Sequence, residues 1–428
     1  MTEKRMTVNV VDSIMGSGKT TAMINSINNA NKEQKFMFIT PYLSEVDRIK
    51  EKCADRNFKS PVAMEGSKIN GIKHLLNNKD NIISTHALFH LFDDEVFELI
   101  RNNEYILILD EVTDVVEPYN ITKDDIDDIL NISKYAHIDE NHFIVWDKPD
   151  YTGRFSDLKR LCDIGSVVEY NNNVVIWLFP IKSFESFKEV FILTYLFEGQ
   201  IQKWYYDFHG VDYRWFYATY ENDKYKIKRR TDDYQPQIID KNLIQICDNQ
   251  KINHIGDPET ALSVTWYQKA MKNSLLKDLK NNTTNWFINI AKSKSQDTLW
   301  TTYKDFKLKI QGKGYTKSYI SMNMRASNDY KDRTVLAYLC NRYVNPVTAN
   351  FFVSNEIPID QDMYALSEML QWIWRSAIRD GKPIKIYIPS KRMRNLLINW
   401  LNTGEISTED KTNIEVKTES FIEKTAKS

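Results

Sequence analysis

Short runs of apolar residues recur along the N-terminal half of the chain, and most of them lead into a polar stretch that can form a helix. Apolar runs bounded by polar or glycine-containing segments are typical of strands that are buried on both faces. Because strands that alternate with helices form parallel sheets covered on both sides, this pattern predicts an α/β unit. The predicted strands lie at 6–12, 36–40, 81–85, 105–109, 174–179 and 190–194.

A second set of apolar runs follows a Tyr-rich and Lys-rich stretch, and it predicts another α/β unit with shorter strands. The predicted fold class is therefore α/β, with two parallel sheets flanked by helices. The strands of the second unit are expected at 286–290, 318–322, 335–340 and 384–388.

We place the boundary between the two units near residue 235, which gives a first domain at 1–235 and a second at 236–405. A polar tail follows at 406–428. The segment at about 118–172 is rich in Asp, Asn and Tyr and lies between strand candidates, so we expect it to be a mostly helical insertion in the first domain.

The strongest chemical signal is the segment Ser13-Ile14-Met15-Gly16-Ser17-Gly18-Lys19-Thr20, which lies between the first predicted strand and a predicted helix. Glycines let backbone N–H groups close around phosphates, and a helix N-terminus favours their negative charge. Ser13 departs from the strict pattern, which has Gly there, although a small residue suffices. The segment predicts an ATP site whose binding residues are Ser13, Gly16, Ser17, Gly18, Lys19, Thr20 and Thr21.

A pair of acids, Asp110 and Glu111, follows the apolar run at 105–109. A strand of this kind presents its last residues at the carboxyl edge of a parallel sheet, where ligands bind. Thr20 and Asp110 are then candidates to hold Mg²⁺, and Glu111 is a candidate to activate the attacking water. The loop and the acid pair together predict that ATP and Mg²⁺ are the cofactors, with Lys19, Asp110 and Glu111 as catalytic residues.

With these two motifs the chain resembles the superfamily 2 helicases, in particular the helicase-like proteins encoded by bacteriophages. The resemblance implies two RecA-like domains. Residues 38–42 and 84–86 are similar to motifs that contact single-stranded DNA in that family, 323–328 to motif V and 371–379 to motif VI. It implies nucleic-acid contacts by Thr40, Pro41, Tyr42, Thr85, His86 and Arg325, and catalytic roles for Gln371, Arg375 and Arg379.

The spacing of Arg375 and Arg379 supports a joint role independently of the resemblance. We expect both on one helix, where residues four apart face the same side. Two arginines presented by a second domain can neutralise charge that develops on a transferred phosphoryl group. The alternative is a surface helix with solvated arginines and with Trp372 and Trp374 in the core.

Charge and composition narrow the choice of partners. Lys plus Arg (57) nearly balances Asp plus Glu (58), so nucleic acid must be bound by local patches rather than by the whole protein. Lys309 and Lys313 belong to a basic run with interleaved aromatic residues, which suits phosphate attraction and base stacking. A second cluster at 224–230 fits a basic hairpin or a protected edge strand.

Four widely spaced cysteines argue against a zinc site or a disulfide framework, and the sequence shows neither a signal peptide nor a membrane segment. We expect the protein to be located in the cytoplasm, which is that of the host cell if the protein is phage-encoded. The expected function is an ATP-dependent DNA helicase or translocase in phage replication or recombination. It would act on single-stranded or forked DNA, with RNA not excluded, together with replication or recombination proteins and without a membrane. The alternatives are a phage DNA-packaging (terminase-like) ATPase and a nucleotide-switched remodelling ATPase.

Overall fold

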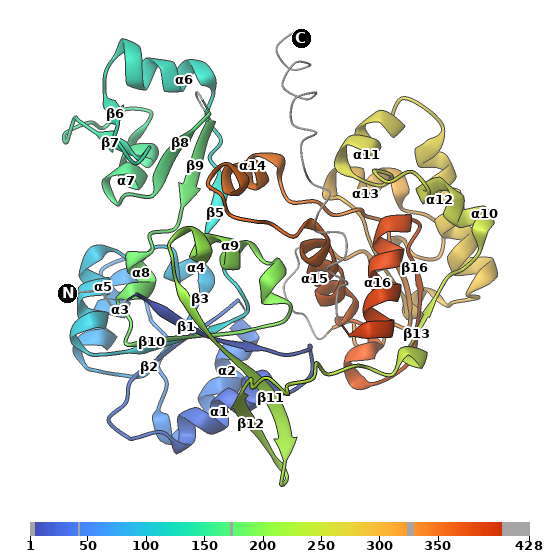
Figure 1. Ribbon diagram of the computed structural model, residues 1–428, viewed down its shortest axis with the longest axis horizontal. Coiled ribbons are helices and arrows are strands. Elements are labelled where there is room, and N and C mark those ends of the chain that lie inside the picture. The colour runs from blue at the N-terminus through green and yellow to red at the C-terminus, as the bar shows by residue number, and fades with distance from the viewer. Residues whose placement is uncertain (1–4, 42, 172–173, 323–328, 405–428) are drawn as a thin grey trace.

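In the computed structural model a seven-stranded sheet organises the N-terminal part of the chain (Figure 1). The structure describes residues 5–41, 43–171, 174–322 and 329–404. The strand order is β12-β11-β1-β10-β4-β2-β3, and neighbouring strands are parallel except β11 and β12. The strands are β1 (Thr7–Asp12), β2 (Phe36–Thr40), β3 (Ile82–Thr85), β4 (Ile106–Asp110), β10 (Glu189–Thr194), β11 (Asp212–Glu221) and β12 (Lys224–Arg229).

Helices cover both faces of this sheet, which explains why its central strands carry apolar residues on both faces. In β4, Leu107 and Leu109 belong to the core on one face, whereas Ile106 and Ile108 belong to the core on the other. We call the sheet and its helices the first lobe. These helices are α1 (Lys19–Asn29), α2 (Leu43–Lys52), α3 (Lys68–Asn77), α4 (His86–Phe89), α5 (Asp94–Asn102), α8 (Lys182–Glu185) and α9 (Ile201–Phe208), with short 3-10 turns at Ala54–Arg56 and Phe197–Gly199.

A small unit projects from the first lobe between β4 and β10 (Figure 1). The prediction that this insertion is mostly helical is wrong, because the unit also contains a three-stranded and a two-stranded antiparallel sheet. Short strands need long-range partners, which a polar local sequence does not reveal. The elements are β5 (Val116–Pro118), α6 (Lys123–Asp127), a π-helical turn (Asp128–Ile132), β6 (Ala136–Ile138), β7 (Ile144–Trp146), α7 (Ser156–Asp163), β8 (Val167–Tyr170) and β9 (Val174–Leu178).

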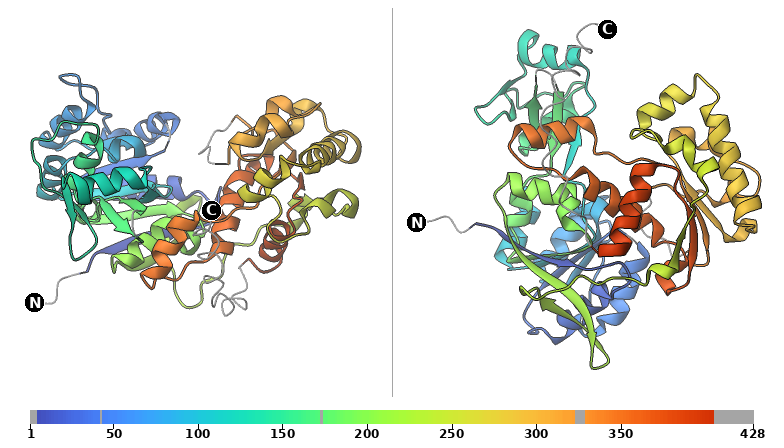
Figure 2. Two further views of the ribbon diagram at one scale, coloured as in Figure 1. Left: turned by 90° about the horizontal axis from the view of Figure 1, so that it is seen from above. Right: turned by 45° about the vertical axis from the view of Figure 1, so that its right-hand side comes forward.

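A four-stranded parallel sheet organises the second lobe, in the order β13-β16-β15-β14. Both views in Figure 2 show this lobe beside the first one. Its strands are β13 (Ile244–Ile246), β14 (Thr298–Thr301), β15 (Val335–Tyr338) and β16 (Ile384–Tyr387). Its helices are α10 (Gln250–Asn253), α11 (Val264–Ala270), α12 (Leu275–Asn285), α13 (Lys307–Ile310), α14 (Pro346–Ser354), α15 (Gln361–Ile373) and α16 (Lys391–Thr403).

Short helical turns complete the second lobe, and one of them corrects a prediction. The expected strand at 286–290 is a π-helical turn that continues α12, because a short apolar run fits a buried helix as well as a strand. At 318–322 only Tyr319 forms a bridge, to Trp300, so no strand forms there. The turns are Lys241–Leu243, His254–Gly256, Trp286–Ile290, Ser295–Asp297, Lys304–Phe306, Thr316–Ser318 and Ala377–Asp380.

The predicted α/β class is confirmed, with two helix-flanked parallel sheets. For the basic cluster at 224–230, the hairpin and the edge strand are both observed. Strand β12 forms a hairpin with β11 and is also the edge strand of the sheet. Within the described part of the chain, no helix is long and apolar enough to cross a membrane.

An arm of the second lobe, residues 341–361, carries α14 across to the first lobe and the insertion (Figure 1). Phe352 is fully buried and packs against Trp204 of α9, with ring centroids 5.9 Å apart. Phe351 meets Tyr170 of the insertion edge-on at 5.8 Å. Both phenylalanines belong to the same buried cluster as one face of the first sheet, so the arm of the second lobe is part of the core of the first lobe.

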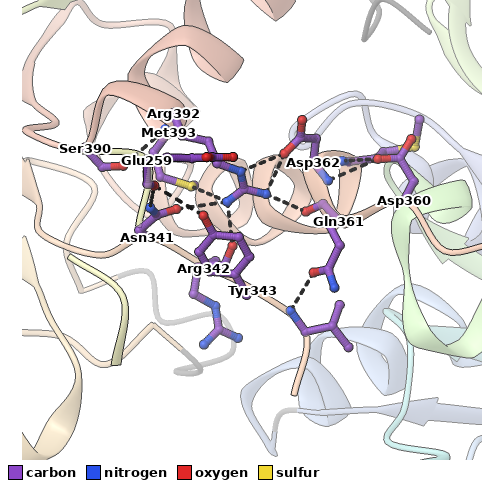
Figure 3. Close-up of polar contacts among 12 residues, drawn as sticks. Glu259, Asn341, Arg342, Tyr343, Asp360, Gln361, Asp362, Ser390, Arg392 and Met393 are labelled. Atoms are coloured by element: carbon purple, nitrogen blue, oxygen red, sulfur yellow. Dashed lines mark hydrogen bonds and ion pairs between the residues drawn. The ribbon is translucent and has the colours of Figure 1, made fainter. Parts of the chain in front are cut away.

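Arg392 fixes the base of this arm (Figure 3). Its guanidinium donates to Asp362 Oδ1 at 2.8 Å, to the carbonyl of Gln361 at 3.0 Å and to Asn341 Oδ1 at 2.9 Å. It also stacks on the ring of Tyr343, 4.3 Å from the centroid. Because these groups come from both ends of the arm and from α16, one side chain holds the three segments together.

Phe352→Ala should lower the free energy of unfolding by about 3–5 kcal/mol, because it leaves a cavity where the arm packs into the core of the first lobe. Val353→Ala is the matched control in the same helix, since Val353 is 56% exposed and should be nearly neutral. Urea unfolding of both variants measures the difference. Equal midpoints for the two variants would show that α14 does not hold the lobes together.

Candidate functional site

The loop at 13–18 joins β1 to the N-terminus of α1, an eleven-residue helix. Gly16 and Gly18 have left-handed backbones, with φ of 81° and 83°. A Cβ at Gly18 would lie 2.3 Å from the ring of Tyr225, so both backbone and space require glycine there. The loop therefore lies over the positive end of the helix, where backbone N–H groups attract an anion.

Lys19 is the first residue of α1, and only 8% of its side chain is exposed. Its ammonium group donates to the carbonyls of Ser13 at 2.6 Å and Ile14 at 3.2 Å, so the side chain folds back along the loop. Burial lowers the pKa of Lys19, although the nearby carboxylates of Glu111, Asp12 and Asp110 act in the opposite direction. A phosphate at the loop would relieve this loss of solvation.

The acid pair lies at the carboxyl end of β4, separated from β1 by the single strand β10. Thr20 donates its hydroxyl to Asp110 Oδ1 at 3.2 Å. Burial raises the pKa of Asp110 to about 7, and the charges of Glu111 and Glu45 add to the effect. Glu111 has φ of 70°, and its N–H donates to the carbonyl of Leu193 at 3.0 Å. Glu111 follows the end of β4 and lines the cleft.

The two arginines do not share a helix, so that part of the prediction is wrong. Helix α15 ends at Ile373, and Arg375 lies in the turn that follows. Ser376 adopts an extended backbone with ψ of −170°, and Arg379 lies in the next 3-10 turn. Because the extended residue breaks the helical repeat, spacing alone could not place the two side chains.

A cleft of about 410 Å³ between the lobes nevertheless brings both arginines to the phosphate loop. Its volume falls within the usual range for small-molecule sites. The predicted site residues that line it are Gly16, Gly18, Lys19, Thr20, Thr21, Asp110, Glu111, Gln371, Arg375 and Arg379. It is also lined by residues that the sequence interpretation missed, namely Met15, Glu45, Arg48, Val112, Tyr225, Glu368, Trp374 and Asp380.

Ser13 and Ser17 are not among the lining residues, although both were predicted to bind the nucleotide. The Ser13 hydroxyl accepts a hydrogen bond from the N–H of Ala218 in β11 at 2.8 Å. This contact explains why serine stands where the strict pattern has glycine. The Ser17 hydroxyl is buried and has no hydrogen-bond partner among the described residues.

The donor set fits a nucleoside triphosphate with Mg²⁺. A lysine, a helix N-terminus and two arginines supply positive charge, while Thr20 and Asp110 offer the hydroxyl and carboxylate oxygens that Mg²⁺ prefers. Within the described ranges no group of three or more His, Cys, Asp or Glu residues could hold a metal alone. Mg²⁺ commonly takes one or two protein ligands and completes its shell with phosphate and water.

The predicted nucleic-acid residues that the structure describes do not line this cleft. Thr40 and His86 are buried at the carboxyl ends of β2 and β3, with half-buried Pro41 after β2, and the Thr85 hydroxyl caps α4 by accepting from Leu88 N–H at 3.4 Å. Lys309 and Lys313 are exposed in and after α13. Tyr42 and Arg325, with the rest of 323–328, lie outside the described residues, as does the tail at 406–428.

Three family models match parts of the chain. The model described as Type III restriction enzyme, res subunit, matches residues 2–141, which contain the loop and the acid pair. The models described as YonV middle domain and YonV C-terminal Rossmann-like domain match residues 116–177 and 239–401.

Two solved structures align with most of the chain. The structure XPD_APO has a TM-score of 0.52 and 12% identity, over 91% of this chain and 95% of that chain. Xpd4 of S. tokodaii has a TM-score of 0.46 and 13% identity, over 92% and 93% of the two chains. The family match and the first of these folds define a helicase-like protein of superfamily 2 with a phosphate loop.

A curated relative places the chain in a particular family. The SPbeta prophage-derived protein YonV of Bacillus subtilis (strain 168) is 44% identical over 410 residues, which is 92% of this chain and 98% of the relative. The chain therefore belongs to the YonV family. The resemblance to phage-encoded, helicase-like proteins of superfamily 2 is confirmed.

Ser13→Ala should lower the free energy of unfolding by about 1–3 kcal/mol, because it leaves the buried N–H of Ala218 without its acceptor. Ser17→Ala is the matched control in the same loop, and it should change the value by less than about 0.5 kcal/mol. Urea unfolding without nucleotide measures both. An unchanged midpoint for Ser13→Ala would contradict the anchoring role of that hydroxyl.

Proposed function

We propose that the protein is an ATP-dependent motor that moves along single-stranded nucleic acid, as a DNA helicase or translocase. One observation carries the proposal: a single cleft brings Lys19, Thr20 and the acid pair of the first lobe together with Arg375 and Arg379 of the second lobe. A nucleotide in that cleft would contact both lobes at once. Its hydrolysis would therefore change the relation between them, which is what a motor requires.

Each residue of the cleft has a proposed role. Lys19 and the loop N–H groups bind the β and γ phosphates, and Thr20 and Asp110 hold Mg²⁺. Glu111 orients the attacking water and accepts its proton, a role that its place in the lining of the cleft supports. Arg375 and Arg379 stabilise the charge that develops on the transferred phosphoryl group, and Gln371 positions them. When bound, Mg²⁺ supplies charge neutralisation on the phosphate oxygens.

The two proposed motor domains are residues 1–235 and 236–405, the first with its insertion. The half-buried Pro41 and Thr85, at strand ends of the first lobe, and the exposed Lys309 and Lys313 of the second are the proposed contacts to nucleic acid, whereas Thr40 and His86 are buried behind them. Phage replication or recombination is the proposed setting, because a relative is prophage-derived.

Steady-state ATP hydrolysis with and without single-stranded DNA, at low and moderate salt, tests the proposal first. We expect stimulation of about tenfold, weaker at higher salt because phosphate contacts release counterions. RNA of the same length is the comparison for strand type. Hydrolysis that is indifferent to both strands would replace the motor by a remodelling ATPase that acts on protein.

Lys19→Ala should abolish ATP binding and hydrolysis, whereas Glu111→Gln should abolish hydrolysis and retain binding, because only the first variant removes a phosphate contact. Equilibrium binding of ATP and turnover, measured on the same preparations, separate the two effects. Near wild-type turnover in Glu111→Gln would exclude it as the group that activates water.

Arg375→Ala and Arg379→Ala should lower kcat, by up to about 10³-fold, with little change in nucleotide affinity. Lys382→Ala is the control, because Lys382 is an exposed cation three positions after Arg379. Turnover at saturating ATP and binding of ATP are measured for all three. If the arginine variants match Lys382→Ala in kcat, the second lobe takes no part in catalysis.

A further inference from the structure

The hairpin formed by β11 and β12 brings an aromatic side chain to the phosphate loop, a feature that no motif in the sequence indicates. Strand β11 pairs in parallel with β1, which leads directly into the loop. The chain then reverses at Asn222 and Asp223, both with left-handed backbones (φ of 51° and 59°), and β12 returns beside α1. Figure 1 shows the hairpin extending past α1 at the edge of the first lobe.

Contacts at several points hold Tyr225 in this place. Its carbonyl accepts a hydrogen bond from Asn25 Nδ2 of α1 at 3.0 Å. Its ring pairs across the hairpin with Tyr220, with centroids 4.8 Å apart and planes tilted by 55°. The Ser13–Ala218 hydrogen bond ties the other strand of the hairpin to the start of the loop. The tyrosine is thus anchored on the helix that begins at the phosphate loop.

The ring lies against Gly18, where its Cδ1 and Cε1 atoms would be 2.3 Å from an added Cβ. It is half-buried and lines the same cleft as Thr21 and Lys19. The only other aromatic side chain that lines the described cleft is Trp374, from the opposite lobe. Tyr225 is therefore the one flat apolar surface that the first lobe presents next to the phosphate-binding N–H groups.

The polar groups of the loop account for phosphates, but none of them provides a surface for a base. A purine has a flat π face, and stacking of a base on an aromatic side chain contributes about 1–3 kcal/mol by alanine substitution. The tyrosine contacts Gly18 at the start of α1 and Asn25 further along that helix, so a nucleotide with its terminal phosphates on the loop could extend onto its ring. The ring would add to the binding free energy of the nucleoside part of the ligand, whereas Lys19 would bind the phosphates.

We infer that Tyr225 packs against the nucleoside of the bound nucleotide, which makes the β11–β12 hairpin a nucleotide-recognition element. The inference rests on the proposed function, because it concerns the ligand of the same cleft. The hairpin is also basic, but Lys228 is paired with Glu221 and Arg230 with Asp12, so part of its charge is already compensated within the protein. Its contact with the loop therefore favours the nucleotide over a nucleic-acid strand as the ligand of Tyr225.

Equilibrium binding of two ligands tests the inference, with Mg²⁺ present throughout: ATP, and inorganic tripolyphosphate, which carries the phosphates without a nucleoside. Tyr225→Ala should weaken ATP binding by about tenfold and change tripolyphosphate binding by less than about twofold. Tyr225→Phe keeps the ring and should bind both ligands like the wild type. Tyr217→Ala is the matched control and should leave both affinities unchanged, because Tyr217 is a half-buried tyrosine of the same hairpin that packs on Tyr234 and does not line the cleft.

Three results would overturn the inference. Equal weakening of both ligands by Tyr225→Ala would mean that the ring only shapes the loop. Unchanged or tighter ATP binding would mean that it lies outside the bound nucleotide or obstructs it, and the hairpin lysines would then be tested for binding single-stranded DNA. If the wild type does not bind ATP at all, both the proposed function and the inference are rejected. If the wild type binds ATP and Tyr225→Ala gives either of the other two results, only the inference is rejected.

Discussion

The parallel register of three neighbouring strands is the constraint on which the cleft depends. In β1, β10 and β4, Asp12 pairs with Thr194 and Leu193 pairs with Asp110, so all three strands end at the same edge of the sheet. The phosphate loop and the acid pair follow the two outer strands of this trio. A slip of one residue would turn their side chains to the opposite face. Burial of the strands on both faces opposes such a slip, because it would move apolar side chains of both cores out of place.

A buried carboxylate just before the loop strengthens this edge. Asp12 is 5% exposed and accepts hydrogen bonds from the N–H groups of Leu196 at 2.9 Å and Phe197 at 3.4 Å. Arg230 forms an ion pair with it at 3.4 Å and donates to its carbonyl at 2.6 Å. Burial raises the pKa of Asp12, while Arg230 and the two N–H groups lower it. The segment after β10 and the end of the hairpin are therefore held to the base of the loop.

The lobes meet through apolar packing on one side and through polar groups at the cleft. The arm at 341–361 inserts Phe351 and Phe352 into the core of the first lobe, and Arg392 fixes both of its ends. Elsewhere Trp400 of α16 donates to the hydroxyl of Tyr195 at 2.8 Å. Packed aromatic rings resist separation more than water-accessible charges do. The packing of the arm therefore helps to hold the two lobes together.

Local sequence determined the parts of this protein that depend on a few consecutive residues. The strand at 6–12, the loop with Lys19 and the strand that ends in Asp110 follow from apolar runs, glycines and charge order, and the structure contains each of them. Tertiary structure decided what depends on distant partners. The run at 286–290 is helical because α12 continues through it, and Ser376 separates Arg375 from Arg379. Tyr225 reaches Gly18 only because β11 pairs with β1 across some 200 positions, and no local pattern carries that information.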